Sequence, residues 1–373
     1  MKKFLSLFLC LAALLGTLFA CAENPTTQGD GATVDLPKTE EKQEKSLGAI
    51  VLSSEHYDVS VAMLSYYFHT NHQAFVKEHI AILPSLSLDL SKSLKDQSFG
   101  KGDSQDELFL GEFEGTWFDY FMDGTLDSVS NLLRYCEVAH EYGVSLGEDE
   151  LAELDENFDS LVAKASTFGM TEEAYLASLY GDGVKEADVR RAMEYSELAN
   201  KGMSVLMQRL SDSIGDEEIR AKYEENPDEF EYNTERTRNV AYMLFGTENA
   251  AENAIALLKS RNVVTAEAFS ALAEELEAAH TYLEDYIKGS LASEVFDAWL
   301  FDENLIAESI TEVPLAIDSS TFCVVLYCGE GHESWYVTVK NAILNEKYDQ
   351  TYQSLSSLHK IFIQEELSKR VPA

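Results

Sequence analysis

The chain changes its pattern across the stretch Ser213-Ile-Gly-Asp216-Glu-Glu-Ile219-Arg-Ala-Lys-Tyr223-Glu-Glu-Asn-Pro-Asp-Glu-Phe230. Asp216 can cap the start of a helix, and the two glutamates after it suit the positive end of the helix dipole. Asn226-Pro227 ends that helix, because proline has no amide hydrogen to continue it. The stretch therefore predicts a short helix between two regions of different periodicity.

Before this stretch, the pattern from residue 55 to residue 230 is helical. Leu, Phe, Tyr and Val recur every three to four residues, with few Pro or Gly inside the runs. One helix is predicted from Trp117 to Tyr142, with Gly143 as its C-cap, and another from Glu148 to Phe168. A third begins at Thr171, a typical N-cap residue. We therefore expect about six helices here.

After Phe230, strands alternate with shorter helices. Arg238 to Phe245 has β character. Helices are predicted over 250–260, 265–277 and 294–301, and strands near 309–317 and 321–328. This order, over about 100 residues, is typical of a small domain in which helices pack on an antiparallel sheet.

A long amphipathic helix is predicted from Glu333 to Arg370. Its wide apolar stripe needs a partner, and the helical region is the natural one. The predicted fold class is therefore α+β and mainly helical. A helical N-terminal domain over residues 48–230 is completed by the C-terminal helix of residues 333–373, and an α+β domain over residues 231–332 is inserted between them.

The first residues have the pattern of a secretory signal peptide over 1–20. Lys2 and Lys3 precede an apolar run that ends at Phe19, and this run is shorter than the roughly 20 residues of a membrane-spanning helix. Leu18-Phe-Ala-Cys21 resembles a bacterial lipobox, with Cys21 as the lipidated residue. Cleavage after a small-x-small site, which would discard Cys21 and release the protein, is the alternative. Residues 21–47 contain no aromatic residue and predict a flexible tether.

The charge is strongly negative. The chain holds 66 acidic and 28 basic residues, a net charge of −38. This charge repels nucleic acid and anionic lipid headgroups, so neither is an expected partner. It would favour cationic polypeptide clients. In the other interpretation, the acidity only keeps the protein soluble.

The cysteines and histidines do not predict a metal site. Cys136, Cys323 and Cys328 lie outside the N-terminal region, and no cysteines or histidines have zinc spacing. Cys323 and Cys328 are five residues apart in one predicted strand, so their side chains should leave opposite faces. His69 and His72 have helical spacing, but such histidines are more often polar surface. No metal or cofactor is predicted.

The order of lipobox, helical domain, inserted α+β domain and returning helix resembles that of PrsA and SurA-like foldases with a parvulin (PpiC-type) rotamase domain. Val240-Ala-Tyr-Met-Leu-Phe245 stands where the first parvulin strand belongs, and Ala268-Phe-Ser-Ala-Leu-Ala273 is similar to its "xFxxLA" helix. Val295-Phe-Asp-Ala-Trp-Leu300 is similar to the later "FxxAxF" run. Asp89 to Gln97 and Trp117 to Phe121 are similar to segments of SurA-like lipoproteins from clostridial bacteria. The resemblance covers residues 50–370.

The resemblance also identifies the candidate site residues. Active parvulins carry one histidine on the first strand and another on the last, where this chain has Tyr242 and Cys323. A rotamase lowers an amide barrier of about 18–20 kcal/mol without a nucleophile, so the two replacements weaken the enzyme hypothesis without excluding it. The candidate substrate-binding residues are Leu291, Val295, Leu300, Phe269 and Phe322. The alternative is that all these residues only pack the core of a degenerate domain.

Three function classes follow. The first is a chaperone or foldase, lipid-anchored on the extracytoplasmic face of a Gram-positive type cell membrane, with a weak or inactive rotamase domain. It would bind unfolded secreted polypeptides in a cleft between its domains, with Tyr66, Tyr67, Phe68, Met203 and Met207 as candidate lining residues. The second is an active peptidyl-prolyl cis-trans isomerase. The third is a structural or solute-binding lipoprotein, although the first half lacks the alternating β/α pattern of solute-binding proteins.

Overall fold

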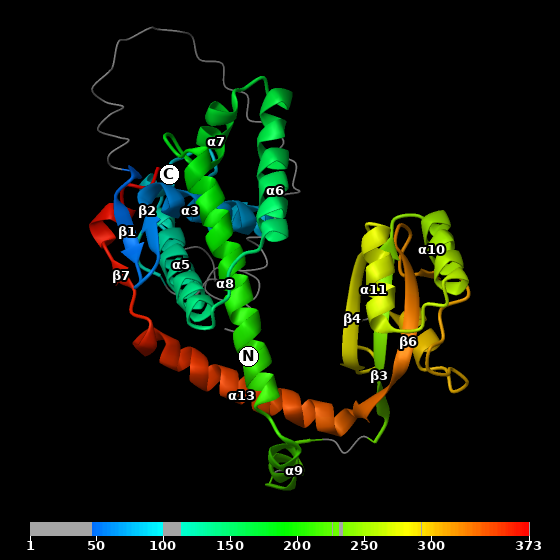
Figure 1. Ribbon diagram of the computed structural model, residues 1–373. Helices are drawn as coiled ribbons and strands as arrows, with labels where there is room; N and C mark the ends of the chain where they lie inside the picture. Colours follow the sequence, from blue (N-terminus) through cyan, green and yellow to red (C-terminus); the bar gives the residue numbers. More distant parts are fainter. Residues whose placement is uncertain (1–46, 100–112, 226, 231–233, 292, 373) are drawn as a thin grey trace. The chain divides into compact units, whose positions relative to one another are not determined.

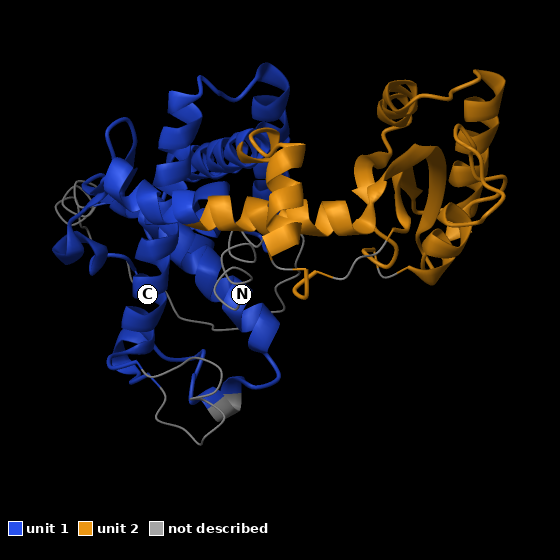
Figure 2. Ribbon diagram, turned by 90° about the horizontal axis from the view of Figure 1, so that it is seen from below, with its two compact units in different colours: residues 1–209, 350–373 blue, residues 210–349 orange. Residues whose placement is uncertain are grey.

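The computed structural model describes residues 47–99, 113–225, 227–230, 234–291 and 293–372 (Figure 1). The chain forms two compact units. Unit 1 contains residues 1–209 and 350–373, and unit 2 contains residues 210–349 (Figure 2). Unit 2 is thus inserted in the sequence between the two parts of unit 1. The predicted signal peptide, Cys21 and residues 22–46 of the predicted tether lie outside the described residues.

Unit 1 is built around long helices. They are α3 (Val61–His79), α5 (Trp117–Glu141), α6 (Glu148–Thr167), α7 (Glu172–Tyr180) and α8 (Glu186–Asp212), with short 3-10 turns at Leu83–Leu86 and Leu94–Asp96. The predicted helices at 117–142, 148–168 and after Thr171 are confirmed. Thr171 caps α7 through its side chain, which accepts a hydrogen bond from the amide of Ala174.

A small sheet completes unit 1, and the sequence did not predict it. Its strands are β1 (Ile50–Ser53), β2 (Asp58–Ser60) and β7 (Phe362–Ile363), in the order β2-β1-β7 with antiparallel pairs. Strands of four, three and two residues are too short to show a period of two. The third strand comes from the far end of the sequence.

The segment after β7 is held firmly against unit 1. It contains α14 (Glu365–Ser368). The Lys95 ammonium donates to the carbonyl oxygens of Lys369 at 3.1 Å and Val371 at 2.9 Å, and the His69 ring donates to the carbonyl oxygen of Pro372 at 2.9 Å. The Val371 side chain is fully buried. These contacts make residues 362–372 an integral part of the helical unit.

Unit 2 is an antiparallel sheet covered by helices. The strands are β3 (Arg236–Phe245), β4 (Ala279–Tyr286), β5 (Leu315–Ala316) and β6 (Phe322–Glu333), in the order β4-β3-β6-β5. The helices on its faces are α10 (Glu248–Ser260), α11 (Ala266–Glu275) and α12 (Glu294–Leu300), and α9 (Asp216–Glu225) precedes the sheet in the sequence. The α+β, mainly helical fold class is therefore confirmed.

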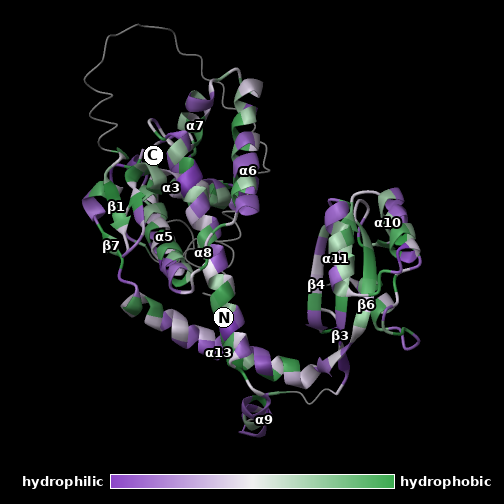
Figure 3. Cartoon of the chain, viewed as in Figure 1, coloured by the Kyte–Doolittle hydropathy of each residue, from purple (hydrophilic) through white to green (hydrophobic). Residues whose placement is uncertain are grey.

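Two parts of this sheet differ from the expectation. β4 was not predicted from the sequence. It is an edge strand whose side chains are largely hydrophilic, whereas β6 is largely hydrophobic (Figure 3). The strand expected near 309–317 is only β5 together with a single bridge between Ile310 and Leu326.

The sheet carries a separate apolar cluster on each face. Along β3 and β6 the side chains alternate between the faces, as the pleat requires. One cluster lies under α10 and α11 and includes Ala241, Met243, Val324 and Leu326. The other lies under α12 and includes Val240, Val325, Tyr327 and Leu300. Cys323 belongs to the α12 face and Cys328 to the α10/α11 face, so the predicted separation of the two thiols is confirmed.

α13 (Ser334–Leu358) follows β6 directly, and it ends twelve residues before the predicted end at Arg370, with β7 and α14 after it. The helix α9 of the opening stretch packs against the first half of α13, with Ile219, Val339 and Ile343 in one buried cluster. Asp216 is the first residue of α9, and its carboxylate accepts a hydrogen bond of 2.6 Å from the Tyr336 hydroxyl. The stretch from Ser213 to Phe230, where the sequence changes from a helical to a mixed pattern, therefore packs against α13 within unit 2.

Candidate functional site

Tyr242, the first candidate catalytic residue, lies half-buried on the α12 face of the sheet. In the sheet, Tyr242 of β3 is paired with Thr281 of β4 on one side and with Val325 of β6 on the other. Its ring meets the Phe296 ring edge-on, with 5.7 Å between the centroids. No hydrogen bond to its hydroxyl is found among the described residues, so this group remains able to donate to a bound amide.

Cys323, the second candidate, is almost completely buried, with 1 % of its surface exposed. It lies between Leu244 of β3 and Leu315 of β5. Burial raises the pKa of its thiol to about 12, so the sulfur stays protonated at neutral pH. A buried neutral thiol in an apolar cluster cannot contact a substrate amide, which favours the core-packing alternative at this position.

The five candidate substrate-binding residues do not form one pocket. Leu300 is buried on the α12 face, together with Tyr242 and Cys323. Phe269 is fully buried under the opposite face, and Phe322 packs on that same opposite cluster. Leu291 and Val295 are exposed at the surface, before and within α12. Only Leu291 and Val295 among these residues are therefore free to meet a ligand without rearrangement.

A polar cluster that the sequence did not reveal lies where β3, β4 and β6 meet. The Asp285 carboxylate accepts hydrogen bonds from the backbone amide of His332 at 2.6 Å and from its ring at 2.8 Å. The Thr237 hydroxyl lies 2.7 Å from the same carboxylate. Burial acts to raise the pKa of Asp285, but the hydrogen bonds from Thr237 and His332 outweigh it and lower the pKa.

This cluster has the features of a structural junction. A side chain on Gly331 would lie 2.2 Å from the Asp285 carboxylate, so only glycine leaves room for these hydrogen bonds. Asp285 itself has a positive φ of 54°, a conformation that Asp adopts more readily than most residues. The His332 ring stacks on Tyr336 with 4.5 Å between the centroids. The arrangement fixes the end of β6 to the start of α13.

In unit 1 the turn between α6 and α7 presents two large apolar side chains to solvent. Phe168 is 42 % exposed and Met170 is 45 % exposed. Gly169 between them has a φ of 66°, and the amide of Met170 donates to the carbonyl oxygen of Ala165 at 3.0 Å. This is a hydrogen-bonded helix end, which holds the two side chains in place. The Phe168 ring also stacks on Tyr175.

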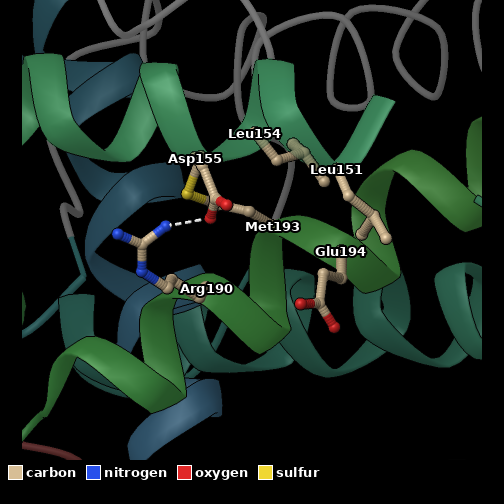
Figure 4. Close-up of a pocket in the computed structure, with 6 residues that line it drawn as sticks. All are labelled: Leu151, Leu154, Asp155, Arg190, Met193 and Glu194. Atoms are coloured by element: carbon tan, nitrogen blue, oxygen red, sulfur yellow. Dashed lines mark hydrogen bonds and ion pairs between the residues drawn. The ribbon is translucent and has the colours of Figure 1, made fainter. Parts of the chain in front are cut away.

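A hollow of about 200 Å³ lies between α6 and α8 of the same unit (Figure 4). Apolar side chains and charged groups share its lining, which consists of Leu151, Leu154, Asp155, Arg190, Met193 and Glu194. Arg190 binds Asp155 across the hollow and lies over the Phe158 ring at 4.0 Å, so it ties α6 to α8. Lys201 makes a second tie, to Glu150 at 2.6 Å.

The lining residues expected in α3 belong to the core. Tyr66, Tyr67 and Phe68 are buried, and the Tyr67 hydroxyl donates to the carbonyl oxygen of Ala192 at 2.8 Å. Met203 and Met207 are half-buried in α8. In the described part of the chain, no three His, Cys, Asp or Glu side chains are grouped to hold a metal ion, and no helix is long and apolar enough to cross a membrane.

No known family profile and no curated protein matches the chain. Among solved structures, a SurA-like chaperone of Campylobacter jejuni matches 85 % of this chain and 99 % of its own, at 13 % identity and a TM-score of 0.26. The foldase PrsA of Lactococcus lactis matches 87 % of this chain and 100 % of its own, at 9 % identity and a TM-score of 0.23. The peptidylprolyl isomerase PrsA of Bacillus anthracis matches 61 % of this chain and 95 % of its own, at 15 % identity and a TM-score of 0.20.

These matches are proteins of the two kinds that the sequence resembles, SurA-like chaperones and PrsA foldases.

Proposed function

We propose that this chain is a chaperone or foldase of the PrsA/SurA-like kind, which binds unfolded secreted polypeptides outside the cytoplasm. The observation that carries this proposal is the α6–α7 turn, where Phe168 and Met170 are fixed in an exposed position. Water-exposed aromatic and Met side chains suit promiscuous binding, because they adapt to many apolar partners. A hydrogen-bonded turn loses little further backbone entropy when a client binds.

The signal peptide and lipobox pattern support a place for this activity. In this proposal Cys21 carries the lipid anchor, and the tether that follows connects unit 1 to the extracytoplasmic face of the membrane. Residues 48–230 and 333–373 would then form the client-binding domain, and residues 231–332 the rotamase-like domain. Discarding Cys21 with the signal peptide would give a secreted chaperone instead.

The rotamase-like domain is weak or inactive in this proposal. The buried Cys323 thiol cannot reach a substrate, and the predicted pocket residues are divided between two faces of the sheet. An active peptidyl-prolyl isomerase is the second candidate. It is favoured by the half-buried Tyr242, whose hydroxyl has no hydrogen bond among the described residues, and by exposed Leu291 and Val295, which lie before and within α12.

One paired measurement tests the two candidates. The mature chain is assayed for suppression of the aggregation of a chemically unfolded client, and for isomerisation of a prolyl peptide, with a Tyr242→Phe variant beside it. We expect suppression by both proteins and an isomerisation rate near background. An isomerisation rate that is well above background and falls in Tyr242→Phe would make the enzyme the first candidate.

A further inference from the structure

We propose that the hollow between α6 and α8 binds one lysine or arginine side chain of an unfolded polypeptide. This inference rests on the chaperone function proposed above and names the kind of client segment that one of its surfaces takes.

The middle of the hollow is apolar. Met193 of α8 is buried there, and the half-buried Leu154 and the exposed Leu151 of α6 stand over it (Figure 4). Lysine and arginine have long aliphatic stems that bury well along such surfaces while the charged head stays near water. The apolar lining therefore matches the stem of a basic side chain.

One end of the hollow is unsuited to binding an anion. Arg190 stands there, but its guanidinium is already occupied by three carboxylates, those of Asp155, Glu186 at 2.7 Å and Asp159 at 3.1 Å. Their combined charge exceeds that of the arginine. A ligand carboxylate would find Arg190 already paired with three carboxylates, and these would repel it.

The other end offers a carboxylate. Glu194 is exposed, and in the described part of the chain it has no salt bridge or hydrogen bond. Glu194 lines the hollow, and in Figure 4 it stands on the side of Leu151, apart from the Arg190–Asp155 pair. An ammonium or guanidinium head that reaches this end would gain a partner without displacing one.

The size of the hollow favours a side chain over a small-molecule ligand. Ligand pockets in proteins usually measure about 300–1,000 Å³ and enclose most of the ligand. This hollow has a volume of about 200 Å³.

Charge complementarity selects a basic occupant over an apolar one. The α6 surface beside the hollow is acidic, with one basic residue, Lys164, against Glu148, Asp149, Glu150, Glu153, Asp155, Glu156 and Asp159. The whole chain has a net charge of −38. Such a field raises the local concentration of cationic segments, and salt weakens it.

The test uses the full mature chain and short fluorescein-labelled peptides made of serine, glycine and leucine with one central lysine, norleucine or glutamate. Binding is measured by fluorescence anisotropy at low salt. We expect the lysine peptide to bind about threefold to fivefold more tightly than the norleucine peptide, which is the upper part of the range of an exposed ion pair. We expect the glutamate peptide to bind most weakly.

Two variants locate the site. Glu194→Gln should abolish the preference for lysine over norleucine, and Leu151→Ala should weaken both peptides. Glu252→Gln is the matched control, since it removes one exposed carboxylate from α10 in unit 2 and should preserve the preference.

Equal binding of the lysine and norleucine peptides, or an unchanged preference in Glu194→Gln, would overturn the inference. If the wild-type chain still suppresses aggregation in that case, the proposed function stands and only the basic side-chain site falls. Loss of both peptide binding and aggregation suppression in the wild-type chain would instead refute the proposed function.

Discussion

Gly202 of α8 lies directly against the main chain of α5 at Tyr135. A Cβ atom built on Gly202 would be 2.1 Å from the carbonyl oxygen of Tyr135 and 3.1 Å from the amide nitrogen of Ala139. Two of the long helices of unit 1 approach each other here at backbone distance. This contact sets the position of α8, and with it the position of Arg190 and Met193.

We predict that Gly202→Ala destabilises the protein by about 1–3 kcal/mol, because the new methyl group must push two packed helices apart. The measurement is urea denaturation followed by circular dichroism. Gly124→Ala in α5 is the control, since nothing lies within 4 Å of its Cβ position. That change should stabilise α5 by about 0.5–1 kcal/mol, because alanine favours a helix. Equal urea midpoints for the Gly202→Ala and Gly124→Ala variants would contradict the close approach of α5 and α8 at Gly202.

Asp285→Asn should destabilise unit 2 by about 1.5–3 kcal/mol at neutral pH, because the hydrogen bonds from Thr237 and His332 lose their charged, partly buried acceptor. Asn tolerates the positive φ of Asp285, so the backbone should not change. Denaturation curves at several pH values measure the effect. Glu284→Gln, on the exposed side of the same strand, is the control.

The pH dependence of this variant follows from the lowered pKa of Asp285. A carboxyl with a lowered pKa in the folded state stabilises the protein above its unfolded pKa, which is about 3.9 for Asp. That contribution is lost as the pH falls through the folded value. The difference between wild type and Asp285→Asn should therefore shrink below about pH 3.9. A difference that stays constant down to strong acid would mean that packing causes it.

Phe168→Ser combined with Met170→Ser should weaken client binding by at least tenfold, because full burial of even one such side chain is worth about 1.5–3 kcal/mol and a factor of ten corresponds to about 1.4 kcal/mol. Suppression of client aggregation measures the effect. Ile306→Ser with Val313→Ser is the control, since it removes two other exposed apolar side chains from unit 2. Equal losses in both double variants would mean that general surface hydrophobicity, and not the α6–α7 turn, binds clients.

The Cys323 thiol should resist alkylation in the folded protein. With a pKa of about 12 and 1 % of its surface exposed, it is both neutral and shielded at pH 8. Iodoacetamide labelling followed by mass spectrometry should modify Cys323 only after unfolding in urea. Rapid labelling of the native protein would reveal an accessible thiol and would revive a catalytic role for this position.

The helices could be predicted from the sequence because their period is repeated many times. α5 has apolar residues over seven turns and ends within one residue of the expected position. β4 was missed because only Tyr286 is fully buried, so an edge strand with polar residues on both faces shows no period. β1, β2 and β7 are shorter than one repeat of any detectable pattern.

The candidate site was less predictable, for a different reason. The separation of Phe322 from Cys323 could have been foreseen, because neighbouring residues of a strand face opposite sides. The cluster of Thr237, Asp285 and His332 could not, since it joins side chains 47 and 48 residues apart that share no motif. The hollow depends in the same way on a contact between α6 and α8, which Arg190 makes with Asp155.

The return of residues 362–372 to unit 1 sets an order in which this protein can be completed. Lys95 and Lys369 are 274 residues apart in the sequence, and β1 obtains its neighbour β7 from the same late segment. Contacts of such long separation form slowly, because closing so long a loop costs chain entropy before the contact stabilises it. Unit 2 is one continuous segment and can finish folding as soon as it has been synthesised. Unit 1 stays incomplete until unit 2 and the segment after it have also been synthesised.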